Sequence, residues 1–148
     1  GGILALGLLF LLVKLITRVK EEVVLRRMSP KERALRELAE LMRRDLIKLN
    51  LTKEFYFELT MIVRRYIERQ HAVRAPEQTT EEFLAAISAN PRFSDETITR
   101  LKAFLQAADL VKYAGFEPDA TSVSQATQTA TDYIEHDAAA AEPQGGTD

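Results

Sequence analysis

Hydrophobic residues form two different patterns along this chain. Residues 3–13 are an unbroken apolar run, ILALGLLFLLV, and basic residues begin directly after it at Lys14. From residue 29 onward, apolar side chains recur at spacings of three and four, which is the period of an amphipathic helix. Neither strict alternation nor an Asn-Gly or Asp-Gly pair indicates a β-hairpin. The pattern therefore predicts an all-α chain, in which an apolar helix precedes a small bundle of about five helices.

The apolar run is expected to belong to a transmembrane helix. It is apolar on every side, and Lys14, Arg18 and Lys20 follow it, as basic residues follow a span on the cytoplasmic side. Residues 3–16 would extend about 21 Å, less than a hydrocarbon core of about 30 Å, so residues 1–20 are expected to be a partial span of a longer protein. A signal peptide, whose basic residues precede its apolar run, and a buried core helix are the alternatives.

Capping residues predict where the helices of the bundle begin. Residues 21–28 should continue the anchor helix, and each later helix should start just after a Ser, Thr or Asp whose side chain can accept from the backbone of the first turn. Asn90-Pro91 and Gly115 are the expected stops of two of these helices. The expected caps are Ser29, Thr52, Thr79 and either Ser94 or Asp95.

The end of the chain carries the weakest pattern. A helix with few large apolar residues is expected after Pro118, and Pro76 should break the chain in the connection over residues 72–78. From residue 137 the sequence becomes small and polar, so residues 137–148 are expected to be a disordered tail. This leaves residues 29–136 as one helical domain.

Charge is distributed unevenly along the chain, although the net charge is only −2. Residues 14–48 contain eleven Lys and Arg against six Asp and Glu, whereas residues 77–148 contain four against thirteen. Because basic residues near a span mark its cytoplasmic side and are attracted to anionic lipid, the basic end should lie against the membrane and the acidic end should face the cytosol. The predicted location is the inner membrane, with a single pass.

Residue types that carry chemistry are sparse. The chain has no cysteine, no Gly-rich phosphate-binding loop and no Gly-x-Ser-x-Gly motif. Its two histidines, His71 and His136, have no partner at metal-ligand spacing and are expected to lie on the surface. We therefore assign no catalytic, cofactor-binding or metal-binding residue and predict that the protein is not an enzyme.

Two aromatic clusters offer a binding surface. Phe55, Tyr56 and Phe57 form one, and Tyr113 with Phe116 forms the other. Aromatic residues at helical spacing usually pack in the core, which is the first interpretation. The alternative is that Tyr56 or Phe116 lines a groove for a partner helix.

Four stretches together resemble a known family. Residues 29–35 (SPKERAL), 55–68 (FYFELTMIVRRYIE), 79–84 (TTEEFL) and 108–114 (ADLVKYA), in this order after an apolar helix, resemble the C-terminal membrane-anchored region of BatD-like proteins of the aerotolerance gene cluster. The resemblance covers about residues 29–134. It implies a protein without catalytic residues that works beside MoxR-type AAA+ ATPases and von Willebrand factor A-domain membrane proteins. Among the polar positions that it implies, Arg64 or Arg65 is expected to pair with Asp109.

The resulting hypothesis is a membrane-anchored adaptor that presents a helical surface to protein partners. The expected partner surface is acidic and lies where residues 53–71 meet residues 79–116, with Glu81, Glu82 and Asp95 beside Tyr56 and Phe116. The alternative is a membrane-tethered, nucleic-acid-binding regulator, since Arg26-Arg27, Arg43-Arg44 and Arg64-Arg65 are basic pairs within helical segments.

Overall fold

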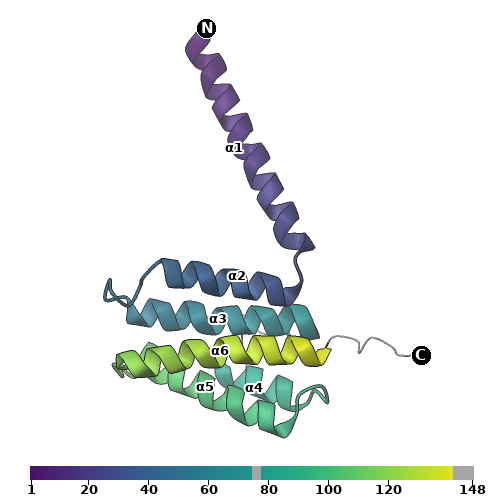
Figure 1. The fold of residues 1–148 in the computed structure, drawn as a ribbon, viewed down its shortest axis with the longest axis vertical. Coiled ribbons are helices and arrows are strands. Elements are labelled where there is room, and N and C mark those ends of the chain that lie inside the picture. The colour runs from purple at the N-terminus through teal and green to yellow at the C-terminus, as the bar shows by residue number, and fades with distance from the viewer. Residues whose placement is uncertain (75–77, 142–148) are drawn as a thin grey trace, which may run out of the picture.

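The computed structural model describes residues 1–74 and 78–141, and this part of the chain contains six α-helices and no strand (Figure 1). The all-α prediction is therefore confirmed. The helices are α1 (Gly2–Arg27), α2 (Pro30–Arg43), α3 (Thr52–His71), α4 (Thr80–Ser88), α5 (Asp95–Tyr113) and α6 (Ala120–Ala141).

Helix α1 projects away from the other five helices (Figure 1), and its large apolar side chains between Ile3 and Val24 are exposed. Residues Gly2–Val24 have a mean hydropathy of 2.1, and among the described residues they form the one segment long and apolar enough to cross a membrane. At about 1.5 Å per residue the 23-residue segment extends about 35 Å. A signal sequence has the same composition and position. The helix continues without a break to Arg27, as predicted for residues 21–28.

Three of the predicted caps form. The side chains of Ser29, Thr79 and Ser94 each accept a hydrogen bond from the backbone N–H three residues later, at 3.1–3.2 Å. The prediction for Thr52 is wrong, because Leu51 is the N-cap and makes no side-chain bond there. A turn over residues 44–50 leads into the helix, with Asp45 at φ 54° and the Leu51 N–H donating to Leu46 O at 2.8 Å.

Helix α3 is the centre of the domain. Helices α2, α5 and α6 all pack against it, and α4 packs on α5 (Figure 1). Its aromatic and aliphatic residues occur on more than one face, so a single neighbour could not cover them. The buried side chains of α3 are Phe55, Tyr56, Leu59, Thr60, Ile62, Val63, Arg64, Tyr66 and Ile67.

Helix α6 extends beyond the predicted end of the domain. Residues 137–141 are helical, so the prediction of a disordered tail from residue 137 is wrong for these five residues. The reason is packing: Ala138 is buried in the core, and Asp137 forms polar contacts with α3. Residues 142–148, the rest of the predicted tail, lie outside the described residues, as do residues 75–77 with the predicted breaker Pro76.

The attachment of α6 can be tested at Ile134, which is fully buried. Ile134→Ala should lower the free energy of unfolding by about 2–5 kcal/mol, because it removes buried methyl groups and leaves a cavity. Urea unfolding of the full chain in detergent micelles, followed by circular dichroism, measures the change. Ser124→Ala on the exposed side of the same helix is the control. Equal effects of the two substitutions would contradict the packing described here.

Candidate functional site

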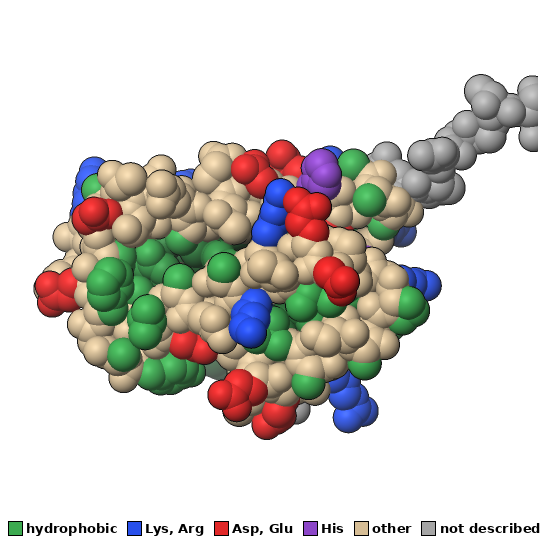
Figure 2. Space-filling model, turned by 90° about the horizontal axis from the view of Figure 1, so that it is seen from below, with side chains coloured by type: hydrophobic (Ala, Val, Ile, Leu, Met, Phe, Trp, Pro, Cys, Tyr) green, Lys and Arg blue, Asp and Glu red, His purple; other side chains and the backbone are tan. Residues whose placement is uncertain are grey.

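A groove lies between α5 and α6. Both helices rest on α3 but make few contacts with each other, so a channel remains between them with α3 as its floor. Its volume is about 990 Å³. Figure 2 shows this side of the molecule, where hydrophobic side chains line a hollow in the surface. Tyr56 and Val63 belong to α3, Leu101, Phe104 and Val111 to α5, and Ala126, Ala130 and Tyr133 to α6.

Both aromatic residues that the sequence singled out for a groove contribute to this one. Tyr56 is buried, as the core-packing interpretation expects, but its side chain still forms part of the lining. Burial raises the pKa of the Tyr56 hydroxyl, and the negative charge of Asp119 adds to the effect. Phe116 lies just beyond α5 and is 54% exposed. It follows Gly115, which ends the helix with φ 71°, as predicted for that stop.

The predicted acidic residues do not lie beside these aromatic residues. Glu81 and Glu82 occupy the first turn of α4, and Asp95 is the first residue of α5. Because α5 has 19 residues, Asp95 and the Phe116 end of the helix are about 27 Å apart. The structure therefore separates the single predicted partner surface into two: a groove beside Tyr56 and Phe116, and a distinct acidic site at the start of α4 and α5.

The fold nevertheless sorts charge into layers. Helices α2 and α3, the two nearest to α1 (Figure 1), contain eight Lys and Arg against six Asp and Glu. Helices α4, α5 and α6 lie farther from α1 (Figure 1) and contain three against eight. Acidic charge therefore gathers on the side of the domain that faces away from the apolar helix, and the groove opens on that side.

The predicted ion pair between Arg64 or Arg65 and Asp109 is wrong. The Arg64 side chain is buried and donates to Gln78 O (2.6 Å) and Thr80 Oγ1 (3.0 Å), which fastens the start of α4 to α3. The nearest cation to Asp109 within the ion pairs of the described residues is Lys112 on its own helix, at 3.9 Å. Burial lowers the pKa of both Arg64 and Lys112, and the Asp109 carboxylate opposes this shift.

Arg65 instead joins a cluster around Glu37 of α2. Arg65 lies 3.5 Å and Arg69 lies 3.1 Å from the Glu37 carboxylate, and Arg33 approaches it at 3.5 Å from within α2. These contacts hold α2 against α3. They also engage Arg65, which belongs to one of the three basic pairs on which the nucleic-acid-binding alternative rests, and the Arg64 side chain of the same pair is buried.

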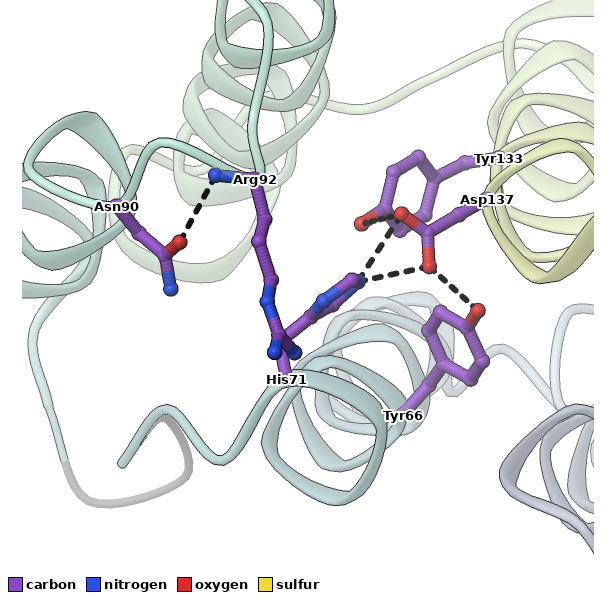
Figure 3. A network of polar contacts seen from close by, with 6 residues as sticks. All are labelled: Tyr66, His71, Asn90, Arg92, Tyr133 and Asp137. Carbon is purple, nitrogen blue, oxygen red and sulfur yellow. Dashed lines mark hydrogen bonds and ion pairs between the residues drawn. The ribbon is translucent and has the colours of Figure 1, made fainter. Parts of the chain in front are cut away.

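A second polar feature joins the end of α3 to the end of α6 (Figure 3). His71 Nε2 lies 2.8 Å and 3.1 Å from the two oxygens of Asp137. Tyr66 donates to the same carboxylate at 2.5 Å, and Tyr133 approaches it at 3.4 Å. The His71 side chain is only 7% exposed and packs on Phe93. The expectation that His71 is a surface histidine is therefore wrong, whereas His136 is exposed.

The His71–Asp137 cluster fits a structural role better than a catalytic one. A histidine and a carboxylate orient one another as in a catalytic dyad, but among the described residues the hydroxyls that contact this carboxylate are those of Tyr66 and Tyr133. Burial raises the pKa of both tyrosines strongly, and Asp137 raises it further, so neither hydroxyl is activated as a nucleophile. Sequence reasoning missed the cluster because His71 and Asp137 are 66 residues apart, with no motif that links them.

No group of three or more His, Asp or Glu side chains in residues 1–74 and 78–141 is placed to hold a metal ion. Comparison with known proteins adds nothing to this geometry: no family model, no curated protein and no solved structure matches the chain.

The raised pKa values of Tyr66 and Tyr133 lead to a prediction of how the free energy of unfolding changes with pH. A tyrosine whose pKa is higher in the folded state stabilises the fold below its unfolded pKa of about 10, and this contribution is lost as the pH rises further. The loss is up to about 1.4 kcal/mol per pH unit for each of Tyr66 and Tyr133. Tyr66→Phe/Tyr133→Phe should therefore be less stable than the wild type at pH 8, and the difference should narrow between pH 9.5 and 11.

Urea midpoints of the full chain in micelles at these pH values measure the effect. Tyr113→Phe, which removes an exposed hydroxyl outside the cluster, is the matched control. A difference between wild type and double variant that stays constant over the whole pH range would contradict this account of the cluster.

Proposed function

We propose that this protein is a membrane-anchored, non-catalytic adaptor that holds a protein partner on the side of its helical domain facing away from the membrane. The observation that carries the proposal is the combination of an apolar, membrane-length α1 with a domain whose distant layer is acidic and contains an open, apolar-lined groove. Exposed apolar concavities on soluble domains commonly mark sites of protein association.

The anchor and the charge layers support one orientation. If α1 crosses the inner membrane with its basic end in the cytoplasm, α2 and α3 lie next to the anionic lipid surface and the acidic layer faces the cytosol. An acidic surface at that position would steer a basic partner toward the domain and would repel the lipid surface. In this orientation both the groove and the acidic start of α4 remain accessible.

The resemblance to BatD-like proteins supplies the kind of partner. A MoxR-type AAA+ ATPase or a von Willebrand factor A-domain membrane protein would meet the domain at the cytoplasmic membrane surface. The adaptor would then act by bringing such a partner to one place on the membrane, which requires a binding surface and no reacting group.

Crosslinking in native membranes tests the proposal, with the full chain as bait and mass spectrometry of the captured proteins. We expect specific capture of an AAA+ ATPase or an A-domain protein. Glu81→Lys/Glu82→Lys/Asp95→Lys should lower capture at least about fivefold, because charge reversal on the distant layer removes attraction to a basic partner.

The matched control is Glu32→Lys/Glu40→Lys/Glu54→Lys, which reverses three exposed carboxylates on α2 and α3 and should leave capture nearly unchanged. Absence of any specific protein partner would refute the adaptor function. Equal loss in the two charge-reversal variants would refute the assignment of docking to the distant layer.

A further inference from the structure

The groove between α5 and α6 has the length of a helix rather than of a compact ligand. Its lining begins at Thr97 and reaches Val111 on α5, which is about 21 Å at 1.5 Å per residue, or about four helical turns. On α6 the lining runs from Ser122 to Ala139, about 26 Å. A compact ligand would contact only part of this length.

The width of the groove also suits a helix. A volume of about 990 Å³ spread over about 21 Å gives a mean cross-section near 50 Å². A helix with its side chains is about 10 Å wide, so its cross-section is near 80 Å², and somewhat more than half of it would fit. The walls belong to two helices that hardly touch and that both rest on α3. A further helix lying between α5 and α6 would cover the apolar lining that both helices contribute to the groove.

The charged residues at the rim of the groove indicate which kind of partner helix would bind there. Asp132 and Glu135 of α6 are exposed at the groove. Arg100 of α5 also lines it and forms an exposed ion pair with Glu96 at 2.7 Å, so these two opposite charges offset one another and Asp132 and Glu135 leave a net negative charge. The rim is thus acidic, whereas its floor and walls are mainly apolar. Tyr56 lines the floor of the groove, and its hydroxyl can donate a hydrogen bond to a polar group of an occupant.

We infer that the α5–α6 groove binds a basic amphipathic helix of a partner protein, with apolar residues at i, i+3, i+4 and i+7 facing Tyr56 and Lys or Arg residues facing Asp132 and Glu135. This inference rests on the proposed adaptor function and specifies how the partner is held. The helix-in-groove mode explains why apolar lining and acidic rim occur together, since an amphipathic helix presents the complementary pattern.

A fluorescent probe in the groove tests the inference directly. The chain contains no cysteine, so Thr129→Cys in the groove and Ser124→Cys outside it each give a single labelling site on α6. The full chain, labelled with a polarity-sensitive dye in zwitterionic lipid nanodiscs, is titrated with a Leu/Lys amphipathic peptide of about 16 residues, the length of the groove. We expect a saturable signal in the micromolar range from residue 129 and none from residue 124, after subtraction of binding to empty nanodiscs.

Two comparisons separate specific from general binding. The same peptide with Glu in place of Lys should bind at least tenfold more weakly. Ala107→Trp, which fills the groove from α5, should weaken binding at least tenfold, whereas Gln106→Trp, the same change at the adjacent exposed position outside the groove, should leave it unchanged. Equal binding of both peptides, or equal effects of the two tryptophans, would overturn the inference.

Other occupants give distinguishable results. A dye response to palmitate without peptide would assign the groove to an acyl chain, and a response that depends on protein concentration alone would assign it to a second copy of this chain; either result overturns the inference. If crosslinking captures a partner equally well with Ala107→Trp, the adaptor function stands and the groove is not its site. If the peptide binds but no partner is captured, the adaptor function fails while the groove retains its binding property.

Discussion

The burial of α3 on nearly all sides is the constraint on which the rest of the domain depends. A 20-residue helix with Phe55, Leu59, Tyr66 and Ile67 all withdrawn from water needs several neighbours, and α2, α5 and α6 supply them. Their mutual arrangement follows from this requirement. Helix α5 packs on α3, and α6 packs on both α2 and α3, while α5 and α6 make few contacts with one another. The space between α5 and α6 therefore stays open, and the groove is a consequence of how the core helix is covered.

Polar contacts fix the relative positions of the helices where apolar packing alone would allow several. Glu37, shared by three arginines, sets α2 on α3, and Arg64 ties the start of α4 to the same helix. The His71–Asp137 cluster does the same for the last turns of α6. Each of these contacts is partly or fully withdrawn from solvent, so removal of one partner would leave a polar group without compensation. Contacts of this kind can fix the register of two helices even where they add little net stability.

The proposed function depends on where α1, the charged layers and the groove lie relative to one another. The apolar α1, the basic layer and the acidic layer follow one another along the same direction, so a membrane at α1 would leave the groove on the side that a soluble partner can reach (Figure 1). The groove has apolar lining along several helical turns beside an acidic rim, which are the features on which the proposed binding of a basic helix rests. Such a surface suits binding that is specific in sign and register without any reacting group.

The sequence by itself determined the all-α class, the apolar α1 and three helix starts, because periodicity and capping at Ser29, Thr79 and Ser94 depend on residues a few positions apart. It also indicated that Tyr56 and Phe116 could line a groove. Only the tertiary structure decided that Arg64 binds Gln78 and Thr80 instead of Asp109, that His71 is buried beside Asp137, and that Glu81 and Asp95 lie apart from Phe116. These outcomes depend on which helices meet and on the rotation of each helix about its axis. Both are set by the packing of whole helices around α3, and sequence patterns that span only a few residues do not contain this information.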